Sequence, residues 1–408
     1  FSKAQYDTHW TTRPVGDRTL RGFDFGDGQP LGTGPWIIAD RSASGVRFRR
    51  NEVHFAAVPY AGSLTLTVED DAEAQLDAWR SGDVDIIWPF DGSRYEEMRE
   101  EEGHLVAAES TNSYFAAFNF GNPTRIDPGW MASPGLREAL NRVIDRAGYA
   151  ETIFGGFIDV ERAGFMTQPW AIDPSVRNPR RNLIAARNLL SANGWVDWDG
   201  NGVRDSPSGD RGAFVCIVRN DADTQFLSTL DSLDTDFRDL GFELEVQRLN
   251  ADDFATRWTS SFDYDLIAIS LNQYAAFSEF DLVGSPWSIR RNLAGWNPGG
   301  YFSPEVDEAI YTFLQSWRVE DMKAALGTIQ RVTNDDPFAL WLGFPQQPVL
   351  VSPNIAGFQP NKMWQSWNTP LLWHNDEASL VTPDPATPLA SPEATPEATP
   401  APGAESGT

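Results

Sequence analysis

The 408-residue sequence contains one cysteine and only four histidines. The cysteine, Cys216, lies in the apolar run 214–218, where a lone thiol packs as a small hydrophobic side chain. A single cysteine excludes a disulfide scaffold within the chain. The histidines, at positions 9, 54, 104 and 374, lack the spacing typical of metal-binding motifs. The sequence therefore gives no support for a histidine or cysteine metal centre.

Signatures of common enzyme active sites are also absent. There is no Gly-x-Ser-x-Gly nucleophile elbow, no phosphate-binding P-loop and no Gly-x-Gly-x-x-Gly motif. Acidic pairs at 335–336 and 96–97 are the remaining candidates for a glycoside hydrolase, which needs two carboxylates that face each other. Adjacent carboxylates point apart on most backbones, so surface charge is the simpler interpretation. We therefore predict a protein without catalytic activity, and keep an enzyme as the rival class.

Basic residues and long apolar runs are scarce as well. The chain has 32 basic against 58 acidic residues, a formal net charge of −26, which argues against nucleic acid as a partner. No run approaches the roughly 18 consecutive apolar residues of a membrane-spanning helix. The chain opens on Phe1 without a signal-peptide pattern, which indicates a processed or partial chain.

The body of the chain alternates between strand and helix patterns, which predicts an α/β fold. Residues 64–68 alternate as in a strand, residues 72–79 have helical periodicity, and residues 84–88 predict another strand, together one βαβ unit. A helix over 134–147 has Ser133 as its N-cap and Pro134 at its first position. Trp79 and Trp317 fall on apolar helix faces and are predicted to be core residues.

A second α/β series begins near Phe214 and implies a second lobe. Strands are predicted over 214–218, 242–247, 264–270 and 338–344, with helices between them. One of these helices is short, capped by Asn250 and predicted to run through Trp258. From about Thr382 the chain becomes rich in Pro, Thr and Ala, so we predict a disordered tail over 379–408.

Five short motifs occur in a fixed order along the chain. They are Gly-Thr-Gly-Pro-Trp at 32–36, Ser-Gly-Asp-Val-Asp-Ile at 81–86, Leu-Arg-Glu-Ala-Leu-Asn-Arg-Val-Ile-Asp-Arg at 136–146, Ala-Asn-Gly-Trp at 192–195 and Ser-Pro-Glu-Val-Asp-Glu-Ala-Ile at 303–310. Together they resemble the solute-binding proteins of ABC importers, in the oligopeptide, dipeptide and nickel class. The resemblance runs from about Gly32 to Trp373.

The resemblance implies a two-lobed, type II periplasmic-binding-protein-like α/β fold that closes on its ligand by a hinge. The expected division is lobe I over 1–118, lobe II over 119–348, a return to lobe I over 349–378, and the tail. In the family a long segment precedes the first motif, whereas only 31 residues precede it here. We therefore expect an incomplete lobe I with uncovered strand edges, and a truncated, wall-displayed fragment that binds nothing stays an alternative.

The resemblance also indicates where a ligand would lie. In peptide-binding relatives, the loop after the strand matching 264–270 often carries a Trp-x-x-Asp pattern that pairs with the ligand's amino terminus. Here that stretch contains no acid, which leaves an oligosaccharide as an alternative to a peptide. For Trp287 and Trp296, core packing is the alternative to ligand binding. For Phe118 and Asn119, at the expected crossover between the lobes, the alternative is packing at the hinge. The candidate ligand-binding residues are Asn272, Gln273, Tyr274, Phe277, Glu279, Asp281, Trp287, Trp296, Phe118 and Asn119.

An acidic run at 197–205 matches the first nine positions of a calcium-binding loop. Position twelve is Ser208 rather than glutamate, and Asp210 is a substitute to consider. An unmetallated Asp/Gly turn is the alternative to a structural calcium ion, and no other cofactor is expected. The candidate ligands are Asp197, Asp199, Asn201, the Val203 carbonyl and Asp205.

The resemblance carries the functional expectation. It implies a monomeric, extracytoplasmic component of an ABC transporter, in the periplasm or at the outer face of the cell membrane. The protein would capture a peptide or another small polar solute and deliver it to the permease membrane subunits.

Overall fold

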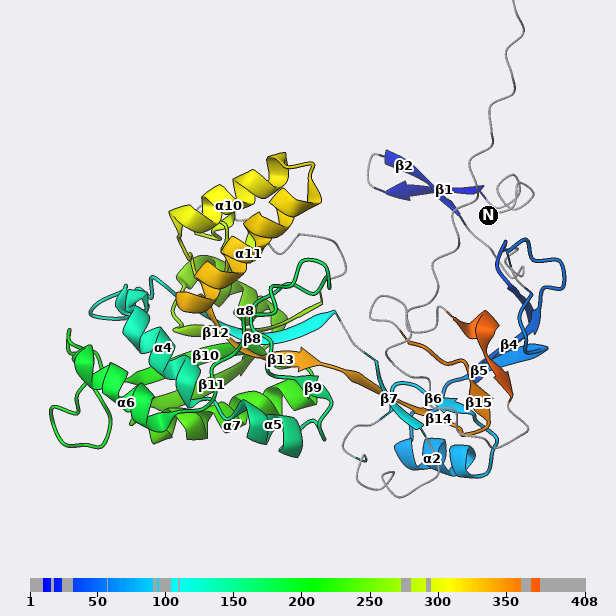
Figure 1. Ribbon diagram of the computed structural model, residues 1–408, viewed down its shortest axis with the longest axis horizontal. Coiled ribbons are helices and arrows are strands. Elements are labelled where there is room, and N and C mark those ends of the chain that lie inside the picture. The colour runs from blue at the N-terminus through cyan, green and yellow to red at the C-terminus, as the bar shows by residue number, and fades with distance from the viewer. Residues whose placement is uncertain are drawn as a thin grey trace, which may run out of the picture.

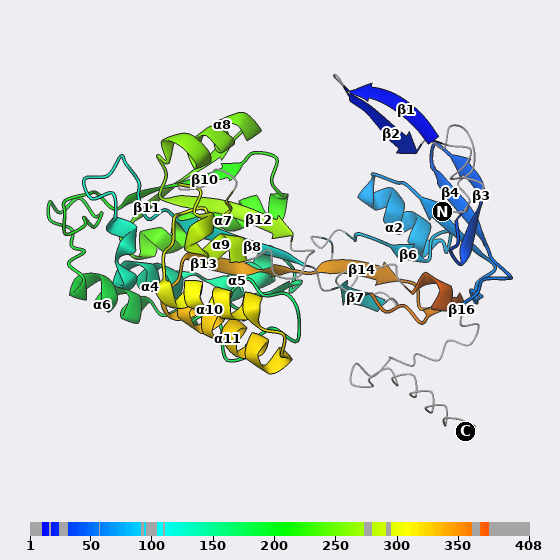
Figure 2. The same ribbon diagram turned by 90° about the horizontal axis from the view of Figure 1, so that it is seen from above.

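The computed structural model describes residues 10–15, 18–23, 32–56, 58–90, 94, 104–108, 111–272, 280–290, 295–360 and 368–374. The described elements form two bodies joined by a pair of crossing strands (Figures 1 and 2). Lobe II, the larger body, contains the middle of the chain. Lobe I contains elements from both ends of the described chain. None of the helices in these ranges is long and apolar enough to cross a membrane.

Lobe II is built around a six-stranded sheet in the order β11-β10-β12-β8-β13-β9. β10, β11 and β12 are parallel, whereas β8 pairs antiparallel with both β12 and β13. β9 pairs antiparallel with β13. The bounds of the strands are β8 Asn112–Phe118, β9 Ile158–Asp159, β10 Ala213–Arg219, β11 Glu243–Leu249, β12 Leu266–Asn272 and β13 Ala339–Pro345.

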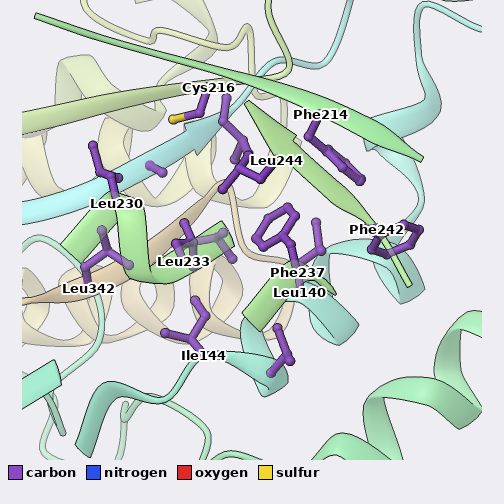
Figure 3. Close-up of a cluster of buried hydrophobic side chains, with 14 of the residues drawn as sticks. Leu140, Ile144, Phe214, Cys216, Leu230, Leu233, Phe237, Phe242, Leu244 and Leu342 are labelled. Carbon is purple, nitrogen blue, oxygen red and sulfur yellow. The ribbon is translucent and has the colours of Figure 1, made fainter. Parts of the chain in front are cut away.

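Helices cover both faces of this sheet. Successive side chains of a strand point to opposite faces, and because both faces are apolar here, each packs against helices. Tyr114, Ala116 and Phe118 of β8 belong to a core with α4 to α7. Figure 3 shows part of this core, with Leu140 of α4 and Leu230 of α7. Phe115 and Ala117 belong to a second core with α8 to α11. The bounds are η2 Trp130–Ala132, α4 Pro134–Val143, α5 Arg146–Thr152, α6 Leu183–Ala192, α7 Thr224–Asp239, α8 Ala251–Thr256, the π-helical turn η3 Arg257–Ser261, α9 Phe280–Val283, η4 Ser285–Trp287, α10 Pro304–Gln315 and α11 Val319–Asp335.

Lobe I consists of small sheets and one helix of the described chain. Its sheets have the orders β3-β4-β5, β6-β14-β7, β1-β2 and β15-β16. Its buried clusters are small, one around Leu76 and Trp79 and the other around Val349. The bounds are β1 Trp10–Val15, β2 Arg18–Phe23, β3 Trp36–Ser42, β4 Gly45–Arg50, β5 Ser63–Thr67, α2 Ala72–Arg80, β6 Ile86–Ile87, β7 His104–Ala108, β14 Gln347–Val351, β15 Ile355–Ala356, η5 Thr369–Leu371 and β16 Trp373–His374.

The two crossings between the lobes lie at the same end of the lobe II sheet. β7 belongs to lobe I and β8 to lobe II, so the first crossing falls ahead of Asn112. β13 and β14 make the return, with Gln346 between them. The sequence placed the first crossing at 118–120, but those residues lie at the carboxyl end of β8, inside lobe II. The return to lobe I was expected over 349–378, and β14, which follows Gln346, begins two residues ahead of that range.

Two local predictions from periodicity are wrong. Strands β5 and β6 do not form a βαβ unit, because β5 pairs with β4 while β6 pairs with β14 in another sheet. The helix predicted over 134–147 is two helices. Ile144 is extended, with ψ of 124°, and the Asp145 side chain caps α5 by accepting from the Gly148 N–H.

Trp317 is also placed differently from the prediction. The helix α10 ends at Gln315, so Trp317 falls in the turn before α11 and is 85% exposed. Trp79, on α2, is buried as predicted. Both tryptophans fit the apolar spacing of a helix. That spacing predicts burial only for a residue that lies within the helix, as Trp79 does and Trp317 does not.

Candidate functional site

The two crossings define one end of the lobe II sheet, which we call the lobe-facing edge. It comprises the carboxyl ends of β10, β11, β12 and β13 and the amino end of β8. Ligands of open α/β sheets bind beyond the carboxyl ends of the strands, and binding sites favour the junction of two domains. The lobe-facing edge meets both conditions, so it is the candidate site.

Each of these five strand ends has an asparagine or glutamine, either at the terminal position of the strand or directly next to it. Asn112 begins β8, and Asn272 is the last residue of β12. The other three carboxamides directly follow their strands: Asn220 after β10, Asn250 after β11 and Gln346 after β13. Sequence reasoning identified only Asn272, because the strand order that brings these ends together cannot be read from local patterns.

Hydrogen bonds tie the central two strand ends together. The buried Thr111 hydroxyl donates to Oδ1 of Asn272. The Ser270 hydroxyl donates to Oδ1 of Asn112 over 3.2 Å. Asn272 is exposed and Asn112 half-buried, so both face solvent while their positions are fixed by neighbours.

The charged groups that follow β10 are engaged with neighbouring groups. Arg219 pairs with Asp221. Asp223 caps α7 by accepting from the N–H groups of Gln225 and Phe226, at 2.9 and 3.1 Å. Burial, and then the Asp223 carboxylate, raises the pKa of Tyr114, which stays a neutral phenol. The charged groups named here are thus paired or capped, and the groups at the strand ends themselves are neutral carboxamides.

Lobe I presents Trp88 and Gln347 toward the same junction. β14 runs away from lobe II, and its partner β6 runs antiparallel, so Trp88, just beyond β6, lies at the lobe II end. The Trp88 Nε1–H donates to Oε1 of Gln347 over 3.1 Å. The indole is 39% exposed. Trp88 was not identified as a site residue from the sequence, which predicted it only as the last residue of a strand.

Of the other predicted ligand-binding residues, those that the structure describes do not gather at this edge. Phe118 and Asn119 are fully buried at the opposite end of β8, where the Asn119 amide donates to the carbonyls of Phe262 and Tyr264. Residues 295–300 pack at that end too, because the Phe120 N–H donates to the Gly299 carbonyl. Gln273, Tyr274, Phe277 and Glu279 lie outside the described residues.

The predicted tryptophans and Asp281 lie on the face of the lobe II sheet that α8 to α11 cover. Trp287 is partly buried against the core on the α10 face of the sheet. Trp296 is 46% exposed, and its ring meets that of Trp258 edge-on, with centroids 5.5 Å apart. Asp281 lies in α9, where burial raises the pKa of its carboxyl.

The acidic run at 197–205 folds into a tight turn that suits a hard cation. Carboxylate oxygens of Asp197, Asp199 and Asp205 lie within 4.8 Å of one another. Asp197 accepts from the N–H groups of Gly202, Gly200 and Asn201, which hold its pKa below the usual value. Calcium prefers such oxygen ligands, supplied here by carboxylates and by the amide of Asn201.

Asp210 is not part of this turn. Its carboxylate accepts from the N–H groups of Ile126 and Asp127, at 2.8 and 3.0 Å, and is buried. It therefore fixes the loop that precedes α4. A surface hollow of about 500 Å³ lies beside the turn, lined by Asp197, Arg187, Arg204 and the end of α7.

The chain matches a known protein family over most of its length. The family model described as "Bacterial extracellular solute-binding proteins, family 5 Middle" matches residues 14–288. A probable di/tripeptide-binding protein of Pseudomonas aeruginosa is 25% identical over 186 residues, 44% of this chain and 34% of that protein. The oligopeptide-binding protein AppA of Bacillus subtilis is 19% identical over 366 residues, 88% of this chain and 64% of AppA. The matches thus span less than two thirds of these relatives.

Solved structures share the fold. An ABC transporter substrate-binding protein from Sinorhizobium meliloti superposes with a TM-score of 0.70 at 17% identity, over 91% of this chain and 80% of that chain. NikZ from Campylobacter jejuni, in complex with Ni(L-His), gives a TM-score of 0.62 at 18% identity, over 84% and 68% of the two chains. The α/β binding-protein fold expected from the sequence is therefore confirmed.

Proposed function

Because the chain belongs to the bacterial extracellular solute-binding proteins of family 5, which are not enzymes, we propose that it is the substrate-binding component of an ABC importer. In this role it works outside the cytoplasm as a monomer. It captures a peptide or a similar small polar solute at the lobe-facing edge, closes, and delivers the solute to the permease subunits. No bond of the solute changes.

The observation that carries this proposal is the pair of crossings at one sheet edge. Two lobes joined only by short connections can rotate about them, and hinges consist of a few residues at element ends. Here the connections precede Asn112 and pass through Gln346, next to the strand-end carboxamides. A solute bound there touches both lobes, so its binding energy favours the closed arrangement.

The similar proteins are named for binding peptides or nickel. The junction of this chain suits an organic solute better than a bare metal ion. Among the described residues, the one group of three or more metal-ligating side chains is the Asp197, Asp199 and Asp205 turn. That turn follows α6 and lies near the amino ends of β10 and β11, where the Gly212 N–H donates to the Arg204 carbonyl, at the opposite end of the sheet from the junction. The described residues of the edge offer a bare nickel ion no comparable ligand set.

Native mass spectrometry and small-angle X-ray scattering test this proposal on the full chain. The chain is incubated with a tripeptide library, with neutral di- to tetrasaccharides and with a nickel–histidine complex. We expect one class to give a stoichiometric adduct and a smaller radius of gyration. No adduct in any class, or turnover of a saccharide, contradicts the proposed function.

A further inference from the structure

We propose that the solute is neutral and rich in hydroxyl groups, a short oligosaccharide, and that Trp88 is the surface on which one sugar ring stacks. This inference rests on the proposed function and specifies its substrate class. Three features of the junction support it: the carboxamides of lobe II, the engaged charges and the exposed indole of lobe I.

The carboxamides match hydroxyl groups in hydrogen-bonding capacity. A carboxamide offers N–H donors and a carbonyl acceptor, and a sugar hydroxyl both donates and accepts. Asn220 is exposed and Asn272 is exposed, with Asn112 half-buried between β12 and β13. Groups on neighbouring strands lie about 5 Å apart, a spacing comparable to that between hydroxyls across a sugar ring.

The charges at the edge do not suit the termini of a free peptide. Moving an ammonium or carboxylate out of water is costly unless an opposite charge pairs with it. Among the described residues of the edge, Arg219 pairs with Asp221, and Asp223 caps α7. Asp253, next to the end of β11, accepts from the Asn250 amide over 2.8 Å. A neutral solute requires none of these partners to be released.

Trp88 offers an apolar face rather than a donor. Its Nε1–H is already bound to Gln347, which fixes the ring beside the start of β14. The face of an aromatic ring carries negative potential and attracts positively polarised edges. The C–H groups on one face of a pyranose are such edges. Trp88 and the carboxamides flank the same crossings, so one ring of a ligand reaches the indole while its hydroxyls face lobe II.

The substrate class is tested by titrating the full chain separately with gluco-, xylo-, manno- and galacto-oligosaccharides, with a tripeptide library and with a nickel–histidine complex, followed by native mass spectrometry. We expect an adduct with at least one saccharide and none with the tripeptides. Binding of tripeptides or of nickel–histidine without any saccharide overturns this inference and leaves the proposed function standing. If no panel binds, both fail.

The role of Trp88 is tested by comparing Trp88→Ala with Trp88→Phe, using calorimetric titration with the saccharide that binds. We expect Trp88→Ala to weaken binding about tenfold, whereas Trp88→Phe keeps a stacking face and loses less. Trp198→Ala is the matched control, because Trp198 is 69% exposed in the acidic turn. Unchanged affinity in Trp88→Ala overturns the stacking role. If Trp88→Ala fails to fold, an affinity of Trp88→Phe equal to that of the control Trp198→Ala overturns the stacking role instead.

Discussion

Asp236 is a buried carboxylate on which several elements of lobe II converge. It accepts from the Tyr149 hydroxyl, from the Asp145 N–H at 2.9 Å and from Arg181 at 3.1 Å. Burial raises the pKa of Asp236 although these donors oppose the shift. Ionising it therefore costs more in the folded chain than in the unfolded chain. Its contribution to stability is largest below the unfolded pKa and declines as the pH rises through the raised one.

Tyr149→Phe removes one donor from this carboxylate. We expect the free energy of unfolding to fall by about 1.5 to 3 kcal/mol at neutral pH, the range for a hydrogen bond to a charged group. The loss should shrink at pH 3, where the carboxyl is protonated. Denaturant titrations at both pH values measure it. Tyr311→Phe, at a position 63% exposed, is the control and should change little. Equal losses at both pH values contradict the role of the charge.

The acidic turn at 197–205 gives a second prediction at this scale. If it holds calcium, the ion binds the folded chain and raises its melting temperature, by about 2 °C or more at saturating concentration. Differential scanning calorimetry in calcium and in EDTA checks this. Asp199→Ala should abolish the response, while Glu308→Ala, another exposed acid, should keep it. A response to calcium in Asp199→Ala rules out this turn as the site.

Two serines precede helices of lobe II and differ in whether their side chains cap the helix. Ser303 and Ser133 both precede a helix that begins with proline, and the sequence predicted a cap at Ser133. The Ser303 hydroxyl accepts from the Val306 N–H at 3.3 Å, whereas Ser133 makes no side-chain cap bond. We expect Ser303→Ala to cost about 1 kcal/mol and Ser133→Ala much less. Thermal unfolding of the two variants measures these losses of stability. Equal losses contradict the assignment of Ser303 as a side-chain cap and of Ser133 as a residue without one.

Sequence periodicity identified elements better than their partners. Strands β10 to β13 lie near the predicted ranges, and α7, α10 and α11 lie between them as predicted, because buried strands and amphipathic helices have distinct apolar periods. The split at Ile144 was missed, since the Asp145 cap interrupts a helix whose apolar face continues. The pairing of β6 with β14 joins residues that are distant along the chain, and local patterns carry no information about it.

The candidate site shows the same limit. Asn272 was found because it follows a clear strand, whereas Trp88, Asn112 and Asn220 become neighbours of one junction only through the sheet order. Phe118 and Asn119 were misplaced because the crossing was set at the wrong end of β8. A search for carboxamides within three residues beyond the predicted strands would have found four of the five strand-end groups.

The two lobes differ in how much apolar surface they bury. Lobe II has extensive cores on both faces of its sheet, whereas the described clusters of lobe I are small. Regions with few buried contacts open at lower free energy. We expect limited proteolysis to cut lobe I first and to leave a resistant fragment that contains residues 134–335. Peptide mapping checks this, and early cleavage within β10 or β12 contradicts it.

The single thiol of the chain has a practical value for studying the whole molecule. Cys216 is fully buried in the lobe II sheet, and burial raises its pKa to about 12. Alkylating reagents attack the thiolate, so this thiol is nearly inert in the folded chain at neutral pH. Cysteines introduced on the two lobes will therefore take up maleimide dyes without removal of the native one. Donor–acceptor distances across the hinge can then be followed in solution, one molecule at a time.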